Sequence, residues 1–398
     1  MQQRQVRDVR LDLFKGAALL IIFINHVGEN PLATVTPGRF GPSDSAEIFV
    51  FISGYAIALA YGPVLAERGF AACQRKALGR CRQLWAANIA TMLVSALVVA
   101  LAVHVGDLPM EASNRLESFA PLFDSPVVAM AWHLVLIYLP FALDILALYI
   151  LLVAAAPLFL WSHARFGMAA VAGSVALYLL AQAAPGLMPP NLWEGSWNFS
   201  PLAWQCVFFL GTSLALVVRS GNMTLPRSRW LLAAALAVVV GMALWKGAAS
   251  DLGRALVPAG LHGWLPEQTI PWADKDTLGP MRLLHFLALA CAAALLVPGD
   301  AAWLRSAPAR LLTACGRHSL PVFCVGVVLS IAGTAVLMAG KGTAAVLAVN
   351  LGGIALLLVL ALVLERRRTR RLPAKVTAKV TAGPASPSST AAAVPETS

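Results

Sequence analysis

The sequence is poor in charged residues. Of its 398 residues, only 12% are Asp, Glu, Lys or Arg, whereas 59% are hydrophobic. A soluble globular chain carries about 25% charged residues, so this composition excludes an ordinary soluble domain. It indicates a protein that is embedded in a membrane.

The sequence also lacks the cysteine and histidine spacings of metal and disulfide sites. None of the six cysteines lies in a CxxC pair, and none falls in a segment that we expect on the oxidising side of a membrane. We therefore expect free thiols, no disulfide and no zinc site. The seven histidines are scattered without the spacing of metal ligands.

Acidic residues are few, 19 against 30 Lys and Arg, which gives a net charge of +11. If the N-terminus is cytoplasmic, 23 of the 30 basic residues fall on the cytosolic side of the predicted spans. This is the positive-inside pattern, and it predicts that both termini are cytoplasmic. The excess charge is thus a topology signal that can also meet anionic membrane lipid, and we expect no nucleic-acid partner.

About ten stretches are apolar enough to cross a membrane as helices of about 20 residues. They lie near residues 12–30, 46–65, 83–105, 132–160, 167–184, 201–218, 230–246, 280–298, 318–339 and 343–364. We predict an all-α, polytopic transmembrane domain over residues 1–371. The tail over residues 372–398 is rich in Ala, Pro, Ser and Thr, and is expected to be disordered and cytoplasmic.

Ionisable groups at membrane depth are costly and are functional candidates by default. Lys15 and His26 lie eleven residues apart on the first predicted helix, which separates them by about 16 Å along its axis. Lys15 then lies near the cytosolic face and His26 near the outer face. His26 is a candidate general base, and the alternative is a hydrogen-bonded residue at a helix end. The alternative for Lys15 is a snorkelling anchor.

The second predicted helix opens with two carboxylates on the same outer side as His26. Asp44 and Glu47 have the spacing of a capping box, and either could also orient the His26 ring. We favour capping for Asp44 and leave Glu47 open. Deeper in this helix, Ser53 and Tyr55 are candidate substrate-binding residues, and Gly54 between them permits a close helix crossing.

Further polar residues are scattered along the chain. Asp144 is expected in the middle of a membrane helix, where a carboxylate must be protonated or paired. Asn198 and Gln205 could bind sugar hydroxyls or satisfy backbone groups, and His318 or Ser319 could cap a helix. The other candidates are Arg10, Arg282 and His285. The predicted outer segments 185–200 and 247–279 carry both tryptophans and carboxylates, which suit either sugar binding or a membrane-interface belt.

Several blocks together resemble the OpgC family of osmoregulated periplasmic glucan biosynthesis. The resemblance spans most of residues 7–330 and lies in RLDLFKGAALLIIFINH, GPSDSAEIFVFISGYAIALAYG, LDILALY, NFSPLAWQCVFFLG, RLLHFLALA and GRHSLPVF. That family is similar to the acyltransferase type 3 superfamily of ten-helix membrane enzymes. The superfamily has a motif of Arg, ten residues and His. This chain has Lys15 in place of the arginine, so the positive charge is kept but the bidentate hydrogen bonding of a guanidinium is lost.

The resemblance implies an O-acyltransferase of the bacterial inner membrane that moves a succinyl group from succinyl-coenzyme A to hydroxyls of periplasmic glucans. It implies acyl-coenzyme A as a co-substrate without a bound cofactor, and glucan, membrane lipid and other glucan-synthesis proteins as partners. His26, supported by Asp44 or Glu47, would be catalytic. Arg10 and Lys15 would meet the donor's phosphates, and Arg282 would meet the succinyl carboxylate or the oxyanion.

A proton-coupled transporter or flippase of a sugar or lipid-linked sugar is the alternative function. Intramembrane Asp144 and His26 would suit proton coupling. Against this alternative, the sequence has no evident inverted repeat and no matched pair of Gly/Pro-broken helices.

Overall fold

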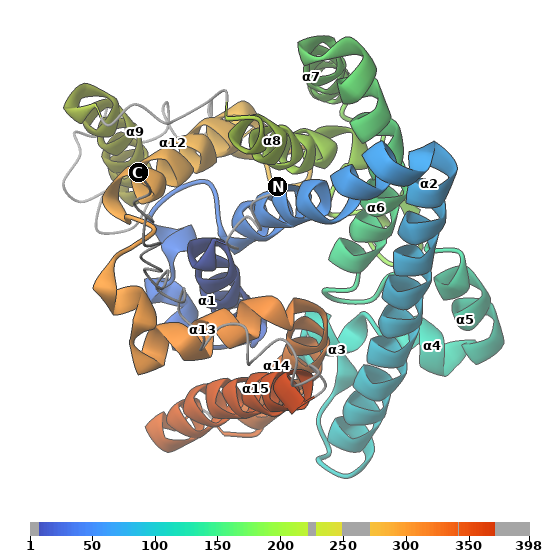
Figure 1. The fold of residues 1–398 in the computed structure, drawn as a ribbon. Helices are drawn as coiled ribbons and strands as arrows, with labels where there is room; N and C mark the ends of the chain where they lie inside the picture. Colours follow the sequence, from blue (N-terminus) through green and yellow to red (C-terminus); the bar gives the residue numbers. More distant parts are fainter. Residues whose placement is uncertain (1–7, 222–227, 249–270, 341, 371–398) are drawn as a thin grey trace, which may run out of the picture.

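The computed structural model describes residues 8–221, 228–248, 271–340 and 342–370, and these are almost entirely helical (Figure 1). The predicted tail at 372–398 and most of the acidic segment 247–279 lie outside the described residues. The long helices are α1 (Val9–His26), α2 (Ser45–His104), α6 (Asp144–Phe166), α7 (Met168–Ala183), α8 (Pro201–Arg219), α9 (Arg229–Ala248), α12 (Pro280–Leu296), α14 (Ser319–Ala339) and α15 (Thr343–Arg370).

Shorter elements connect the long helices. They include α3 (Asn114–Glu117), α4 (Ala120–Asp124), α5 (Pro126–Leu134), α13 (Ala307–Arg317), several short 3-10 helices, and a two-stranded antiparallel ribbon of β1 (Pro190–Asn191) and β2 (Gly195–Ser196). Helix α1 packs against α2, α13 and α14, and α2 packs against α6 and α8. In Figure 1, α1 therefore lies between the orange and red helices and the green ones.

Six described helices, namely α2, α6, α8, α9, α14 and α15, are long and apolar enough to cross a membrane. Helices α7 and α12 are apolar but shorter. The helical, membrane-embedded class is therefore confirmed. The count of about ten spans and the cytoplasmic position of both termini stay predictions.

Two predicted spans, 46–65 and 83–105, are the two halves of the long helix α2. Helix α2 runs from Ser45 to His104 and contains Pro63, and it is interrupted by Gly69, whose φ of 76° and ψ of 178° are not helical. Proline removes a backbone donor, and glycine adopts positive φ without strain. These two residues redirect the chain between the two apolar halves of α2.

The predicted helix over 132–160 is interrupted. Helix α5 ends at Leu134 and α6 begins at Asp144. Between them lie Pro140 and two residues with positive φ, Leu136 at 62° and Ala142 at 65°, which a right-handed helix cannot contain. Asp144 therefore lies at the N-terminus of a helix and not in the middle of one, which corrects our expectation.

Glycines allow the close contact between α2 and α8. A Cβ atom on Gly54 would lie 1.9 Å from the Phe208 carbonyl oxygen, and one on Gly211 would lie 2.1 Å from the Phe51 carbonyl oxygen. The Thr212 hydroxyl donates to the Gly54 carbonyl at 3.0 Å across this contact. The predicted close crossing at Gly54 is thus confirmed, and it fixes the part of α2 that carries Ser53.

We predict that Gly54→Ala destabilises the protein, because the added methyl group must push backbone against backbone. Overpacking of this kind costs about 1–3 kcal/mol. Thermal unfolding of the detergent-solubilised protein measures the effect. The control is Gly173→Ala in α7, where a Cβ would meet nothing within 4 Å. Equal unfolding temperatures for the two variants would contradict the prediction.

Candidate functional site

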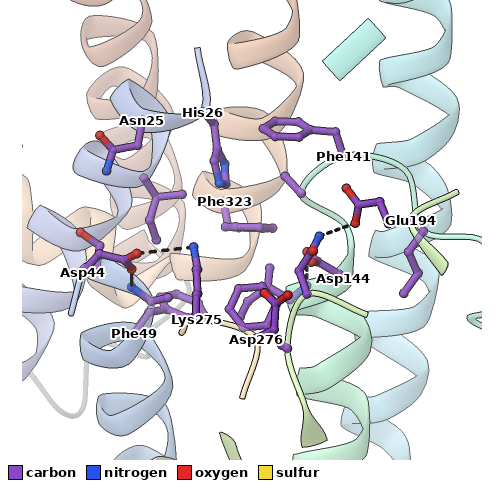
Figure 2. A pocket seen from close by; sticks show the side chains of 18 of the residues that line it. Asn25, His26, Asp44, Phe49, Phe141, Asp144, Glu194, Lys275, Asp276 and Phe323 are labelled. Atoms are coloured by element: carbon purple, nitrogen blue, oxygen red, sulfur yellow. Dashed lines mark hydrogen bonds and ion pairs between the residues drawn. The ribbon is translucent and has the colours of Figure 1, made fainter. Parts of the chain in front are cut away.

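Two cavities lie along α1, one at its C-terminal end and one beside Lys15 in its N-terminal half, and they meet at a pair of aromatic side chains. The His26 pocket, of about 330 Å³, is lined by His26, Asp44, Phe141, Asp144, Glu194, Asn198, Lys275 and Asp276 (Figure 2). The Lys15 pocket, of about 280 Å³, is lined by Lys15, Ser53, Tyr61, Arg80, Tyr149 and Ser319. Phe49 and Phe323 line both pockets, and their ring centroids are 6.2 Å apart.

His26 is the last residue of α1 and faces its pocket beside Phe141. The two rings meet edge to face, with centroids 5.1 Å apart. Arg115 Nε donates to the His26 carbonyl at 2.7 Å and so binds the end of the helix, while its guanidinium lies 4.9 Å from the Phe141 ring centroid. Among the described residues, His26 Nδ1 has no hydrogen-bond partner.

Asp44 and Glu47 form the predicted capping box at the start of α2. The Asp44 carboxylate accepts from the Ala46 N–H, and Glu47 accepts from the Asp44 N–H at 2.9 Å. Glu47 is fully buried and forms an ion pair with Arg282 of α12 at 2.6 Å, and Asp44 lies 3.2 Å from the same guanidinium. The capping interpretation is confirmed.

The same contacts leave neither carboxylate bound to the His26 ring. Either carboxylate could have oriented the His26 ring, but Arg282 binds both of them. Arg282 itself is buried and does not line the His26 pocket. These three residues therefore hold the start of α2 to α12, and only Asp44 faces the cavity.

Lys275 projects into the His26 pocket from the segment before α12 (Figure 2). Its ammonium lies 3.4 Å from an Asp44 oxygen and 5.3 Å from the Phe199 ring centroid. The Asp44 carboxylate raises the pKa of Lys275, so the lysine remains charged at neutral pH. No sequence pattern had marked this lysine as a site residue.

Carboxylates form the opposite wall of the His26 pocket. Asp144 opens α6, Glu194 lies in the β1–β2 turn, and Asp276 follows Lys275. Asn198 donates to Glu194 at 2.5 Å. Partial burial raises the pKa of Asp276 to about 6, so this carboxyl group is mostly ionised at pH 7. The segments 185–200 and 247–279, predicted to lie on the outer side and singled out for their carboxylates, contribute Glu194 and Asp276 to this wall.

The Lys15 pocket has the opposite charge. Lys15 and Arg80 are the charged side chains among its described lining residues, and no carboxylate lines it in the part of the chain that the structure describes. The Lys15 ammonium lies 4.7 Å from the Phe49 ring centroid. Ser53 and Ser319, both predicted site residues, add hydroxyl groups to this pocket.

The remaining predicted site residues lie outside both pockets. Arg10 forms an ion pair with Asp8 and donates to the Val297 carbonyl, and Tyr55 is half-buried nearby in α2. Gln205 binds Ser174 of α7. His285 bonds to Ser43 at 2.6 Å, and His318 bonds to Glu365 at 2.9 Å.

Several pocket residues had no assigned role in the sequence analysis, among them Arg80, Phe141, Glu194, Lys275 and Asp276. Arg80 and Lys275 looked like ordinary members of the charge pattern along the chain. Asp276 could have been found from the sequence, because it belongs to a segment that combines carboxylates with tryptophan. Phe141 lies in the loop that sequence periodicity had assigned to a helix.

Together the pockets can hold two chemically different ligands. A cationic cavity with hydroxyl groups suits an anionic ligand, and a carboxylate-lined cavity with aromatic side chains suits a polyhydroxylated neutral one. His26 lines the second cavity, where an imidazole can serve as a proton acceptor.

The sequence matches a known protein family over nearly its whole length. The family model described as OpgC protein matches residues 7–369. No curated protein and no solved structure matches the chain. Because the family match covers nearly the whole sequence, the chain belongs to the OpgC family, which implies a membrane acyltransferase-type role in glucan modification.

Proposed function

We propose that the protein transfers a succinyl group from succinyl-coenzyme A to a hydroxyl group of a periplasmic glucan, across the bacterial inner membrane. The observation that carries this proposal is the pair of oppositely charged cavities along α1, which meet at Phe49 and Phe323. A donor with phosphates and an acceptor with hydroxyl groups require such different surroundings.

The donor enters the Lys15 pocket, which faces the cytosol in the predicted topology. Lys15 and Arg80 bind its phosphates, and the planar guanidinium of Arg80 can form the bidentate hydrogen bonds that a lysine cannot. Lys15 and His26 are separated by about 16 Å along the helix, so the thioester arm of the donor extends past Phe49 and Phe323 toward His26. In this proposal Arg10 does not bind the donor, because its guanidinium forms an ion pair with Asp8.

The glucan binds in the His26 pocket from the periplasmic side. Asp144, Glu194 and Asp276 accept hydrogen bonds from sugar hydroxyls, and Phe141 offers an apolar face to a sugar ring. A carboxylate can accept two or more such bonds. The acidic wall repels anionic acceptors, so a neutral sugar is preferred.

His26 acts as the general base in the reaction. It removes the proton from the attacking glucan hydroxyl, and that oxygen forms a bond to the acyl carbon. When the carbon–sulfur bond breaks, His26 returns the proton to the departing thiolate. Arg115 holds the His26 backbone, and Phe141 packs against the ring, so these two residues fix the base in place of the expected carboxylate.

We predict that His26→Ala abolishes glucan acylation. Loss of a general acid–base group lowers rates by about 10²–10⁴-fold. Mass spectrometry of periplasmic glucans, from cells lacking the protein and complemented with each variant at matched membrane abundance, measures the added acyl mass. His104→Ala, which changes an exposed histidine at the end of α2, is the control and should restore acylation fully. Full restoration by His26→Ala would remove His26 from the mechanism, and a parent chain that adds no acyl mass would refute the proposed function.

Lys15→Gln should raise the KM for the acyl-coenzyme A donor by about tenfold, because one charge-assisted contact to phosphate is lost. The KM for glucan should change little, since Lys15 lies in the other pocket. Steady-state rates in nanodiscs, with each substrate varied in turn, separate the two constants. Arg68→Gln, at an exposed position in α2, is the matched control. A rise in the glucan KM alone would reverse our assignment of the pockets.

Glu194→Gln should raise the glucan KM several-fold and leave the donor KM unchanged, because the amide accepts sugar hydroxyls less strongly than a carboxylate does. The same steady-state assay reads out both constants. Glu111→Gln removes an equivalent charge at an exposed position outside the pocket lining and should behave like the parent. An unchanged glucan KM in Glu194→Gln would exclude this carboxylate from the acceptor site.

A further inference from the structure

Acyl transfer places a negative charge in the His26 pocket. When a hydroxyl oxygen attacks a thioester, the former carbonyl oxygen becomes an oxyanion, and enzymes stabilise it with donors already in place. The pocket opposes this charge, because it is lined by Asp44, Asp144, Glu194 and Asp276. The negative end of the α1 dipole also lies there, at His26. The reaction therefore requires a positive group aimed into the cavity.

Lys275 is the only lysine or arginine among the described residues that line this pocket. Arg282, our sequence-based candidate for the oxyanion, is buried against Glu47 and Asp44 and lies outside the lining. Arg115 is also outside the lining, and its guanidinium donates to backbone carbonyls of α1. The cation that faces the cavity is therefore Lys275.

The backbone around Lys275 is held from two helices. Tyr178 and Gln182 of α7 and Trp204 of α8 each donate a side-chain hydrogen bond to a carbonyl in the segment 275–278, at 2.6–3.1 Å. Tyr178 and Trp204 are themselves buried. These bonds hold the backbone of the segment in place, and preorganised groups of this kind suit electrostatic stabilisation of a transition state.

The ammonium of Lys275 keeps donors available for a ligand. It has three N–H groups, and its contact with Asp44 is 3.4 Å long, whereas a strong charged hydrogen bond measures about 2.7–2.9 Å. The side chain is 42% accessible, and Figure 2 shows the nitrogen between Asp44 and the acidic wall, on the side of the cavity that faces His26.

We propose that Lys275 is a catalytic residue that binds the oxyanion of the tetrahedral intermediate, a role that rests on the proposed acyl transfer. The glucan hydroxyl oxygen bonds to the acyl carbon while its proton passes to His26. The carbonyl π electrons move to the acyl oxygen, beside the Lys275 ammonium. Collapse restores the carbonyl, breaks the carbon–sulfur bond, and returns the proton from His26 to the thiolate.

The test uses the full-length protein in nanodiscs, with succinyl-coenzyme A and glucan isolated from cells that lack the protein. Lys275→Gln should lower kcat by about 10²–10³-fold, the usual loss for one oxyanion donor, with both KM values within threefold of the parent. Lys275→Arg keeps the charge and should retain activity within about tenfold of the parent. Arg39→Gln, which removes a charge from an exposed loop, should match the parent.

The double variant Asp44→Asn with Lys275→Gln separates the oxyanion role from simple neutralisation of Asp44. The proposal expects the double variant to stay as slow as Lys275→Gln, because the oxyanion still has no cation. Recovery toward the rate of Asp44→Asn would overturn it, and so would a Lys275→Gln kcat within threefold of the parent. In both cases the parent still transfers the acyl group and the proposed function stands, whereas an inactive parent would refute both.

Discussion

The ion pair between Glu47 and Arg282 is the interaction on which the His26 pocket depends. Glu47 has no accessible surface, and its carboxylate lies 2.6 Å from the Arg282 guanidinium. A buried charge is strongly destabilising when its partner is removed, and at membrane depth water cannot compensate. The pair therefore ties the first turn of α2 to α12. It also sets the position of Asp44, which shares the same guanidinium and forms an ion pair with Lys275 in the pocket.

A second constraint lies at the other end of α1. A Cβ atom on Gly16 would lie 1.9 Å from the Leu312 carbonyl oxygen, and one on Gly316 would lie 1.8 Å from the Asp12 carbonyl oxygen. Helices α1 and α13 thus meet backbone to backbone, as small residues permit in membrane proteins. With Arg115 bound to the His26 carbonyl at the opposite end, α1 is fixed at both ends. Lys15 and His26 therefore keep their places in two separate cavities.

The division between the pockets explains how one bundle can serve two unlike ligands. In the proposed reaction the donor and the glucan meet beside the apolar rings of Phe49 and Phe323, which line both cavities. In such surroundings electrostatic interactions are stronger than in bulk water. The cations of one pocket and the carboxylates of the other then act on their own ligands with little screening.

Much of the molecule could be predicted from sequence because the signals are local or compositional. Apolar runs predicted the long helices, the Asp44–Glu47 spacing predicted the capping box, and Gly54 predicted a close crossing. The assignment of Asp144 to mid-helix was wrong because apolar content alone does not reveal that Leu136 and Ala142 adopt positive φ. Only the tertiary structure decided which charges meet. The pairing of Glu47 with Arg282, and the entry of Lys275 into the His26 pocket, join segments more than two hundred residues apart. Such pairings depend on how the helices pack, and no local pattern in the sequence encodes them.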